Sequence, residues 1–334
     1  MTMLMRSLFA LRSPAGPRGR LTILIFHRVL EQPDPLFPEE VDAARFDTIC
    51  GWLADWFNVL PLGDAVARLK EGRLPARAAA ITFDDGYADN HDVALPILKR
   101  RALPATFFVA SGFLDGGRMF NDSVIETVRR ISTPALDLRG LGLDPGLGEE
   151  LPVADMGQRR VAIERLLGVV KYLPLDQRDR VVGELARRSG ALLPTDLMMR
   201  SAQVRALHDQ GMTIGAHTRS HPILANLSPA LAEEEIVAGR DRLQDIVGAP
   251  ITLFAYPNGK PGVDYHAGTA ALVRELGFEA AVTTAWGAAA AGSDRYQLPR
   301  FSPWDRRALR YGWRLLGNMG RPAAIAVAPA TTSV

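Results

Sequence analysis

Two adjacent carboxylates, Asp84 and Asp85, follow a short β-prone run and precede Gly86. Successive side chains of a strand point to opposite faces, so both acids reach one site only where the strand breaks into a loop, which Gly86 permits. Burying two acids is costly unless they hold a cation or a proton. Because Asp-Gly after a strand is also an ordinary turn signal, a chemical role for the pair depends on companion residues elsewhere.

Two imidazoles, His217 and His221, stand four residues apart at the end of another β-prone run. Pro222 disfavours helical geometry at His221, so a tight loop is expected there. In a loop or on a helix, side chains at this spacing can converge on one ion. Two histidines and one carboxylate are a common ligand set for zinc and leave an open position for water.

Predicted strands and helices alternate along most of the chain, a pattern typical of parallel α/β folds. A closed barrel of seven or eight strands fits this pattern better than an open sheet, and it gathers the carboxyl ends of its strands at one site. Both the acidic pair and the histidine pair fall at such ends. The predicted strands cover residues 21–27, 58–62, 78–84, 105–109, 212–217, 251–256, 279–284 and 297–301.

The alternation is interrupted between residues 114 and 205, where three helical stretches surround a Gly/Pro/Leu-rich segment. We therefore expect an α/β barrel over residues 21–305 that carries a helical insertion at about 114–205, near the rim of the site. Residues 1–20 are expected to form an N-terminal tail. Residues 306–334 are expected to contain a helix, which covers residues 306–319, and a disordered end.

The composition is that of a globular protein with an ample core: 47% of its 334 residues are hydrophobic. The net charge of +2 gives no field that would draw the protein onto nucleic acid. Cys50 is the only cysteine, which excludes an internal disulfide and a thiolate metal cluster, and it lies in an apolar-periodic helix that favours a core thiol.

The apolar runs near the N-terminus are interrupted by Arg6 and Arg12. They are too short for a transmembrane helix and lack the pattern of a signal peptide, so no stable membrane insertion is expected. A cytoplasmic location is the default. Loose membrane contact by this basic, apolar segment, or export, is the alternative.

The two motifs resemble those of the polysaccharide deacetylases, the NodB homology group or carbohydrate esterase family 4. Residues 82–86 (TFDDG) match the first motif and residues 217–221 (HTRSH) the second, in the family's order, and the likeness extends over about residues 21–301. The resemblance implies a distorted (β/α) barrel and removal of acetyl groups from N-acetylated sugars. It also implies that Asp84 is the general base and that Asp85, His217 and His221 bind a divalent metal, with zinc expected.

The chain departs from the family pattern at two places. The arginine of the family's third motif, which holds the catalytic aspartate, is absent before residues 254–259, and we predict that Arg300 replaces it. The histidine of the last motif, the general acid, is also absent. His27 follows Phe26 on the first predicted strand and resembles the aromatic-histidine pair of members with a permuted motif order, so His27 is the candidate acid. The alternative for His27 is a structural histidine that caps a strand.

An acetylated glycan is the expected partner, and the oligomeric state is left open. The backbone N–H of Asn258 is expected to stabilise the oxyanion, as the matched position does in relatives. Two other functions remain open: hydrolysis of another C–N or ester bond by the same site, and carbohydrate binding with weak catalysis. The predicted substrate-contacting residues are Tyr87, Tyr256, Pro257, Asn258 and Gly259.

Overall fold

A computed structural model describes residues 2–327 of the chain. These residues form two compact units, which are described separately. Unit 1 comprises Met1–Gln32, Val41–Leu114 and Met199–Val334, and unit 2 comprises Pro33–Glu40 and Asp115–Met198. The expected disordered C-terminal end falls partly on residues 328–334, which lie outside the described residues.

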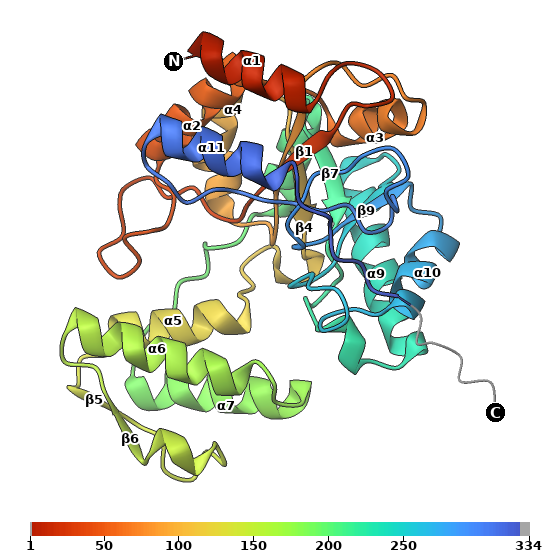
Figure 1. The fold of residues 1–334 in the computed structure, drawn as a ribbon. Helices are drawn as coiled ribbons and strands as arrows, with labels where there is room; N and C mark the ends of the chain where they lie inside the picture. The colour runs from red at the N-terminus through yellow and green to blue at the C-terminus, as the bar shows by residue number, and fades with distance from the viewer. Residues whose placement is uncertain (1, 328–334) are drawn as a thin grey trace. The chain divides into compact units, whose positions relative to one another are not determined.

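Unit 1 is built on a curled, parallel, seven-stranded sheet with the order β1-β3-β4-β7-β8-β9, with β2 also paired to β3 (Figure 1). Residues on both faces of these strands except β2 are buried or nearly so, which explains why the strands have near-continuous apolar sequences. The predicted distorted α/β barrel is confirmed. The strands are β1 (Leu21–Phe26), β2 (Asn58–Val59), β3 (Ala78–Phe83), β4 (Thr106–Val109), β7 (Thr213–Ala216), β8 (Leu253–Ala255) and β9 (Ala280–Val282).

Residues 298–301, here called the closing segment, connect the last strand to the first. The amide of Leu298 donates to Ala281 of β9 at 2.9 Å, and the amide of Phe301 donates to Ile23 of β1 at 2.9 Å. The predicted strand at 297–301 is therefore an irregular extended piece, and it closes the curled sheet by hydrogen bonds to β9 on one side and β1 on the other.

Helices of unit 1 pack around this sheet (Figure 1). Helix α9 begins with Pro229 at its first position, and the Ser228 hydroxyl accepts a bond from the Leu231 amide at 3.4 Å. Pro96 lies in the first turn of α4, which directly follows a π-helical turn at Asn90–Ala94. The helices are α1 (Thr2–Arg12), α2 (Ala43–Trp56), α3 (Leu62–Lys70), α4 (Leu95–Arg100), α8 (Ser201–Asp209), α9 (Pro229–Val247), α10 (Ala267–Glu275) and α11 (Ala308–Asn318).

The segment 1–20, expected as a tail, contains helix α1, which contacts α2 and α11. Met5 and Phe9 are fully buried, and the Phe9 ring lies 4.5 Å from that of Phe57. Their spacing of four residues places them on one helix face. The sequence does not reveal which face of α1 is buried, because the other side of the helix is also apolar. Cys50 is a core thiol as predicted, and burial raises its pKa to about 12.

Unit 2 has a hydrophobic core of its own, formed largely by its helices α5 (Phe120–Arg130), α6 (Met156–Val170) and α7 (Leu175–Ser189). The Gly/Pro/Leu-rich segment contains the antiparallel pair β5 (Ala135–Asp137) and β6 (Glu150–Pro152), which the sequence does not predict. Asp34 accepts two bonds from Arg129 at 3.0 and 2.6 Å and thereby ties residues 33–40 to α5. Within residues 2–327, no helix has the length and apolar character needed to cross a bilayer.

Candidate active site

The acidic pair lies where β3 ends. Asp85 has a φ of 75° and Gly86 a φ of 93°, so the strand breaks directly after Asp84. A side chain at Gly86 would place its Cβ 2.8 Å from Cγ1 of Val109, so this turn requires glycine. Asp84 and Asp85 are only 3% and 6% exposed. The turn therefore allows two sequential acids to be buried at the same end of the sheet, as the sequence predicts.

Asp85, His217 and His221 converge. Oδ1 of Asp85 lies 3.4 Å from Nε2 of His217 and 3.4 Å from Nε2 of His221. One ligand atom from each of the three residues lies within 4.8 Å of the other two. Two ligands about 2.1 Å from an ion at a tetrahedral angle are separated by about 3.4 Å, so the three atoms have the spacing of a metal ligand set.

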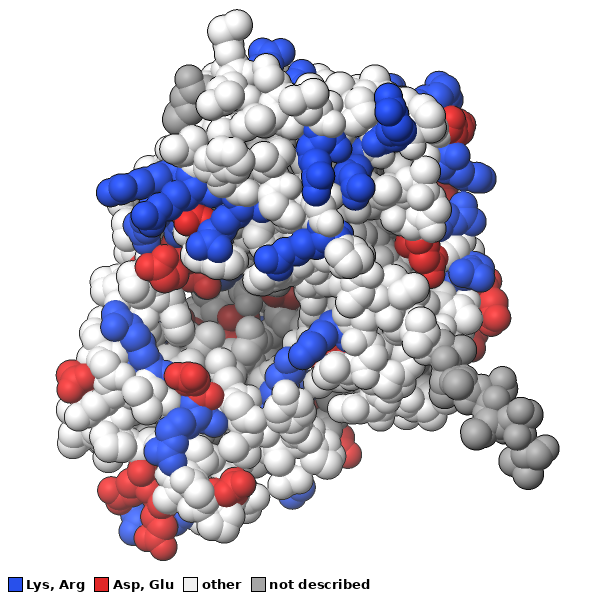
Figure 2. Space-filling view, viewed as in Figure 1, with Lys and Arg blue, Asp and Glu red and all other residues white. Residues whose placement is uncertain are grey.

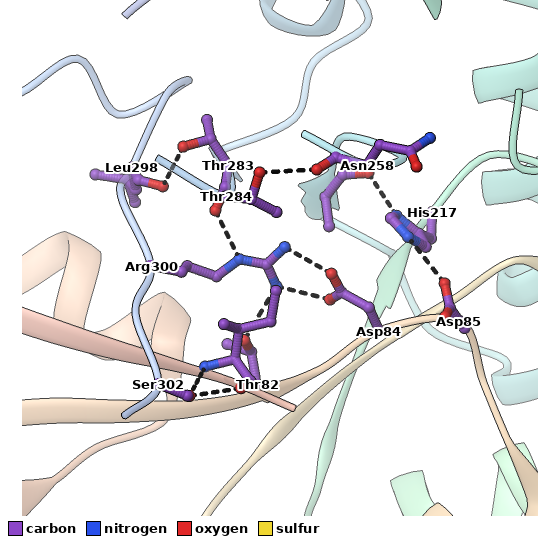
Figure 3. A network of polar contacts seen from close by, with 12 residues as sticks. Thr82, Asp84, Asp85, His217, Asn258, Thr283, Thr284, Leu298, Arg300 and Ser302 are labelled. Atoms are coloured by element: carbon purple, nitrogen blue, oxygen red, sulfur yellow. Dashed lines mark hydrogen bonds and ion pairs between the residues drawn. The ribbon is translucent and has the colours of Figure 1, made fainter. Parts of the chain in front are cut away.

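The ring of His217 is oriented by the backbone. Its Nδ1 lies 2.7 Å from the carbonyl of Ala255 at the end of β8, and because a carbonyl can only accept, Nδ1 carries the proton. Nε2 is therefore the nitrogen that faces Asp85, and Figure 3 draws the contact between the two side chains. Histidine ligands commonly have this arrangement, in which the second ring nitrogen is fixed by a backbone carbonyl.

The electrostatics of the three residues suit a cation. Burial lowers the pKa of His221 to about 4, so its ring is neutral near pH 7 and its lone pair is available. Burial alone would raise the pKa of Asp85, but the hydrogen bond with His217 and the charge that His221 carries when protonated hold it below the usual range. For His217, burial is outweighed by the hydrogen bond with Asp85 and the charge of Asp84, and its pKa is raised. The carboxylates of Asp84 and Asp85 therefore favour a positive charge at the point that Nε2 of His217 and Nε2 of His221 face.

Arg300 makes a bidentate pair with Asp84 (Figure 3). Its two terminal nitrogens lie 2.6 Å from the two carboxylate oxygens, and neither side chain exceeds 4% exposure. The guanidinium also donates to the Thr82 hydroxyl at 3.1 Å and, through Nε, to the carbonyl of Thr283 at 2.9 Å. Burial would raise the pKa of Asp84, but the charge of Arg300 outweighs it and lowers the pKa, so Asp84 is ionised at neutral pH.

The loop that carries the histidines is held by a residue with no obvious signal in the sequence. Glu235 of α9 accepts the amide of Ser220 at 2.8 Å and its hydroxyl at 2.8 Å. Thr218 and His221 have φ values of 62° and 54°, and the Thr218 hydroxyl accepts the His221 amide at 3.0 Å. Glu235 is one of three consecutive acids on a helix, a pattern that reads as a solvated face.

His27 follows β1, and its side chain is exposed. The Asp84 amide donates to the carbonyl of Phe26 at 2.9 Å, so the backbone of His27 directly follows a residue bonded to the acidic turn. Its backbone is fixed, because the His27 carbonyl accepts a bond from the Asn90 amide group at 2.8 Å. Next to it, Arg28 pairs with Asp89 at 2.8 Å.

The loop at residues 256–259 brings one predicted contact residue to the surface and buries the others. Tyr256 is fully buried, donates its hydroxyl to the Tyr296 carbonyl at 2.9 Å and stacks on Tyr265 with ring centroids 3.9 Å apart. The predicted sugar contact by the Tyr256 ring is therefore wrong: the ring belongs to the core. Pro257 and Gly259 are also buried.

Asn258 is partly exposed and has a φ of 57°, and its carbonyl accepts the Thr284 hydroxyl at 2.8 Å. Tyr87 is only 4% exposed, and the guanidinium of Arg28 lies 4.8 Å from its ring centre. Tyr87 therefore offers little surface to a substrate, and of the five predicted contact residues only Asn258 is substantially accessible.

Comparison with known proteins agrees with the motifs. The family model described as polysaccharide deacetylase matches residues 71–133 and 181–281, which include the acidic pair and both histidines. A relative is YxkH of Bacillus subtilis (strain 168), whose name places it among the polysaccharide deacetylases. It is 21% identical over 284 residues, which cover 84% of this chain and 71% of YxkH.

Solved structures share the fold. The Streptococcus pyogenes deacetylase PplD in complex with acetate superposes with a TM-score of 0.59 at 19% identity, over 90% of this chain and 99% of PplD. IcaB from Ammonifex degensii superposes with a TM-score of 0.53 at 19% identity, over 90% of this chain and 98% of IcaB. At these identities the likeness establishes the architecture alone.

Proposed function

The chain belongs to the polysaccharide deacetylase family, and on that premise we propose that it is a metal-dependent hydrolase. In this proposal it removes N-acetyl groups from N-acetylhexosamine residues of a polysaccharide or glycan intermediate and releases acetate. The observation that carries the proposal is a division of labour between neighbouring acids. Asp85 shares a ligand-like cluster with two histidines, whereas Asp84 is ionised and lies outside that cluster.

Asp85, His217 and His221 would hold the metal, and zinc suits two imidazoles and one carboxylate. A divalent ion bound there polarises the acetyl carbonyl and acidifies water. The protein supplies ligands whose orientation is already fixed, since His217 is bonded to Ala255 and the histidine loop to Glu235.

Asp84 would accept the proton of the attacking water. Arg300 keeps the carboxylate ionised and fixes its plane through both oxygens, which supports the role predicted for the arginine. The family's arginine would thus be replaced by one from the closing segment, at a different point in the chain. The backbone N–H of Asn258, in a loop with left-handed geometry, would donate to the oxyanion.

His27 would protonate the leaving amine. Its exposure supports this role, and so does its position directly after Phe26, whose carbonyl accepts the Asp84 amide. His27→Ala is expected to lower kcat by roughly 10²-fold or more and to abolish the fall in rate at high pH, because that fall reports deprotonation of a general acid. His91→Ala, which removes a histidine paired with Asp92, is the matched control and should retain activity. Full turnover of His27→Ala with an unchanged pH profile would contradict the role.

The overall proposal is tested by acetate release from N-acetylated chito-oligosaccharides and other acetylated glycans. The purified protein should lose activity on chelation and regain it with zinc. Asp85→Asn should lose bound metal and activity together, whereas Asp84→Asn should lose activity and keep the metal. Hydrolysis of an unrelated amide or ester, with no acetate from any glycan, would favour the alternative substrate. Glycan binding without any hydrolysis would favour the carbohydrate-binding alternative.

A further inference from the structure

Helices α1 and α11 of unit 1 each carry apolar side chains on two faces. Toward the core, α1 buries Met5 and Phe9, and α11 buries Tyr311 and Leu315. A second apolar row on each helix, spaced i, i+4, i+7, lies beside that buried face, and only one member of each row, Leu8 on α1 and Leu316 on α11, packs partly against the core. These rows are Leu4, Leu8 and Leu11 on α1 and Leu309, Trp313 and Leu316 on α11.

The second rows are largely open to solvent. Leu4 is 55% exposed, Leu11 81% and Trp313 51%. Single exposed apolar residues need no explanation, but these are gathered on two helices that contact each other. A groove of about 450 Å³ is lined by Leu8, Leu11 and Arg12 of α1 together with Trp313, Leu316 and Gly317. The two rows therefore form one continuous apolar surface, here called the α1–α11 surface.

Positive charge surrounds this surface. Exposed arginines accompany the apolar rows at positions 6 and 12 of α1 and at 310 and 314 of α11, and neither helix contains an acid. Arg314 pairs with Asp305, which directly precedes α11. Figure 2 shows basic side chains spread over this part of unit 1, with neutral surface between them.

The charge is asymmetric along the chain. Residues 1–30 and 306–334 together carry ten arginines and no acid. Since the whole chain has 39 basic and 37 acidic residues, the remainder holds 29 basic against 37 acidic residues and is net negative. The near-neutral total therefore conceals a strongly cationic region that contains α1 and α11.

We propose that the α1–α11 surface docks the protein on an anionic lipid bilayer, with both helices lying in the plane of the interface. An apolar row flanked by arginines is the pattern of an interfacial helix, and Trp313 has the amphipathic ring that favours the headgroup level. A second copy of the chain fits less well, because a symmetric contact would bring the two cationic rims together. Nucleic acid fits less well because the centre of the surface is apolar.

The test is co-sedimentation of the full chain with vesicles of phosphatidylcholine alone and of phosphatidylcholine mixed with phosphatidylglycerol. Binding is expected to the mixed vesicles and to weaken with added salt. Leu11→Glu with Trp313→Glu should weaken it roughly tenfold or more, because charges would replace the exposed apolar contacts. Arg6→Gln with Arg310→Gln should also weaken it, and should reduce its dependence on phosphatidylglycerol.

Matched controls place the same changes elsewhere on unit 1. Leu231→Glu alters a leucine of α9 that is 52% exposed, and Arg68→Gln removes an exposed arginine of α3. Both should bind vesicles like the parent protein, and all variants should keep its thermal unfolding midpoint. Equal vesicle binding by the α1–α11 variants and the controls, or no binding by the parent protein, would overturn the proposal. A concentration-dependent dimer that Leu11→Glu with Trp313→Glu abolishes, without vesicle binding, would assign the surface to a second copy.

Discussion

Two bidentate Asp–Arg pairs, one in each unit, have nearly the same geometry in different surroundings. Asp84 and Arg300 are at most 4% exposed, and the guanidinium is additionally bonded to Thr82 and Thr283. In unit 2, Arg129 is 29% exposed and Asp34 13% exposed, and the pair joins the chain of residues 33–40 to α5. The contacts are alike, so burial and neighbours decide what each pair can do.

Only the buried pair is suited to chemistry. Asp84 is adjacent in sequence to Asp85, which converges with His217 and His221, and the charge of Asp84 contributes to the raised pKa of His217. Among the described residues, Asp34 belongs to no such cluster, and it also accepts a bond from the Leu36 amide at 2.8 Å. An Asp–Arg pair is a candidate for a catalytic carboxylate when water is excluded from it and a second set of reactive groups faces the same site.

The largest expected difference between the pairs is in activity. Asp84→Asn should reduce acetate release by roughly 10²–10⁴-fold, because an amide cannot accept the proton of water. Asp34→Asn makes the same change in the other pair and should leave kcat unchanged. The measurement is steady-state hydrolysis of an acetylated oligosaccharide at matched metal content. A comparable loss in both variants would show that the two carboxylates do not differ in function.

A difference in stability should follow on removing the cations. Arg300→Met leaves a fully buried carboxylate unpaired, which should cost about 3–5 kcal/mol of the free energy of unfolding. Arg129→Met should cost about 1 kcal/mol or less, since water screens its pair. Denaturant unfolding, with hydrogen exchange to follow each unit, measures both.

Arg300→Met should also move the acid limb of the rate–pH profile to higher pH, since Asp84 loses the charge that lowers its pKa. Arg300→Lys keeps a charge but not the fork geometry and should fall between the parent protein and Arg300→Met. Equal destabilisation by Arg300→Met and Arg129→Met would contradict the expectation that burial makes the Asp84–Arg300 pair the more costly one to break.

The smallest expected effect is the acid sensitivity of unit 2. Burial would raise the pKa of Asp34, but bonds from Arg129 and the Leu36 amide lower it from the ordinary 3.8. A depressed folded-state pKa stabilises above the unfolded value, and this contribution is lost as pH falls below about 4 toward the folded value. Hydrogen-exchange protection of α5 should therefore fall in that window by at most about 1 kcal/mol. In Asp34→Asn this component should be absent, and its persistence would assign the acid loss to other carboxylates.

The sequence predicts the fold well where an element is so fully buried that its apolar pattern has one interpretation. Buried strands such as Leu21–Phe26 and Ala78–Phe83 have no polar face, and their apolar runs are unambiguous. The paired strands β5 and β6 could not be predicted in the same way, because three residues are too few to show a period. Helix α1 was missed as a packed element because both of its faces are apolar, which hides the one that enters the core.

The candidate site divides similarly. The two acids are adjacent in sequence and the two histidines are four residues apart, so the spacing within each pair is enough to predict that its members lie close together. Arg300 lies 216 residues from Asp84, and only the order of the strands predicts that the two ends meet. Tyr256 was misplaced because an aromatic residue beside a turn reads equally well as a ligand contact or a core ring. The role of Glu235 could not be predicted, because an acid on a helix gives no indication that it accepts hydrogen bonds from a distant loop, here the one that carries the histidines.

The closing segment has a consequence for how the protein is made. A nascent chain released only as far as residue 297 has β1 through β9 but lacks Arg300, so the carboxylate of Asp84 at the end of β3 then lacks the guanidinium that pairs with it. Since an unpaired buried charge is strongly unfavourable, the incomplete sheet cannot settle around an ionised Asp84. Closure of the sheet and ionisation of Asp84 are thus expected to occur together during biosynthesis. A truncated or incompletely folded polypeptide is therefore expected to be inactive.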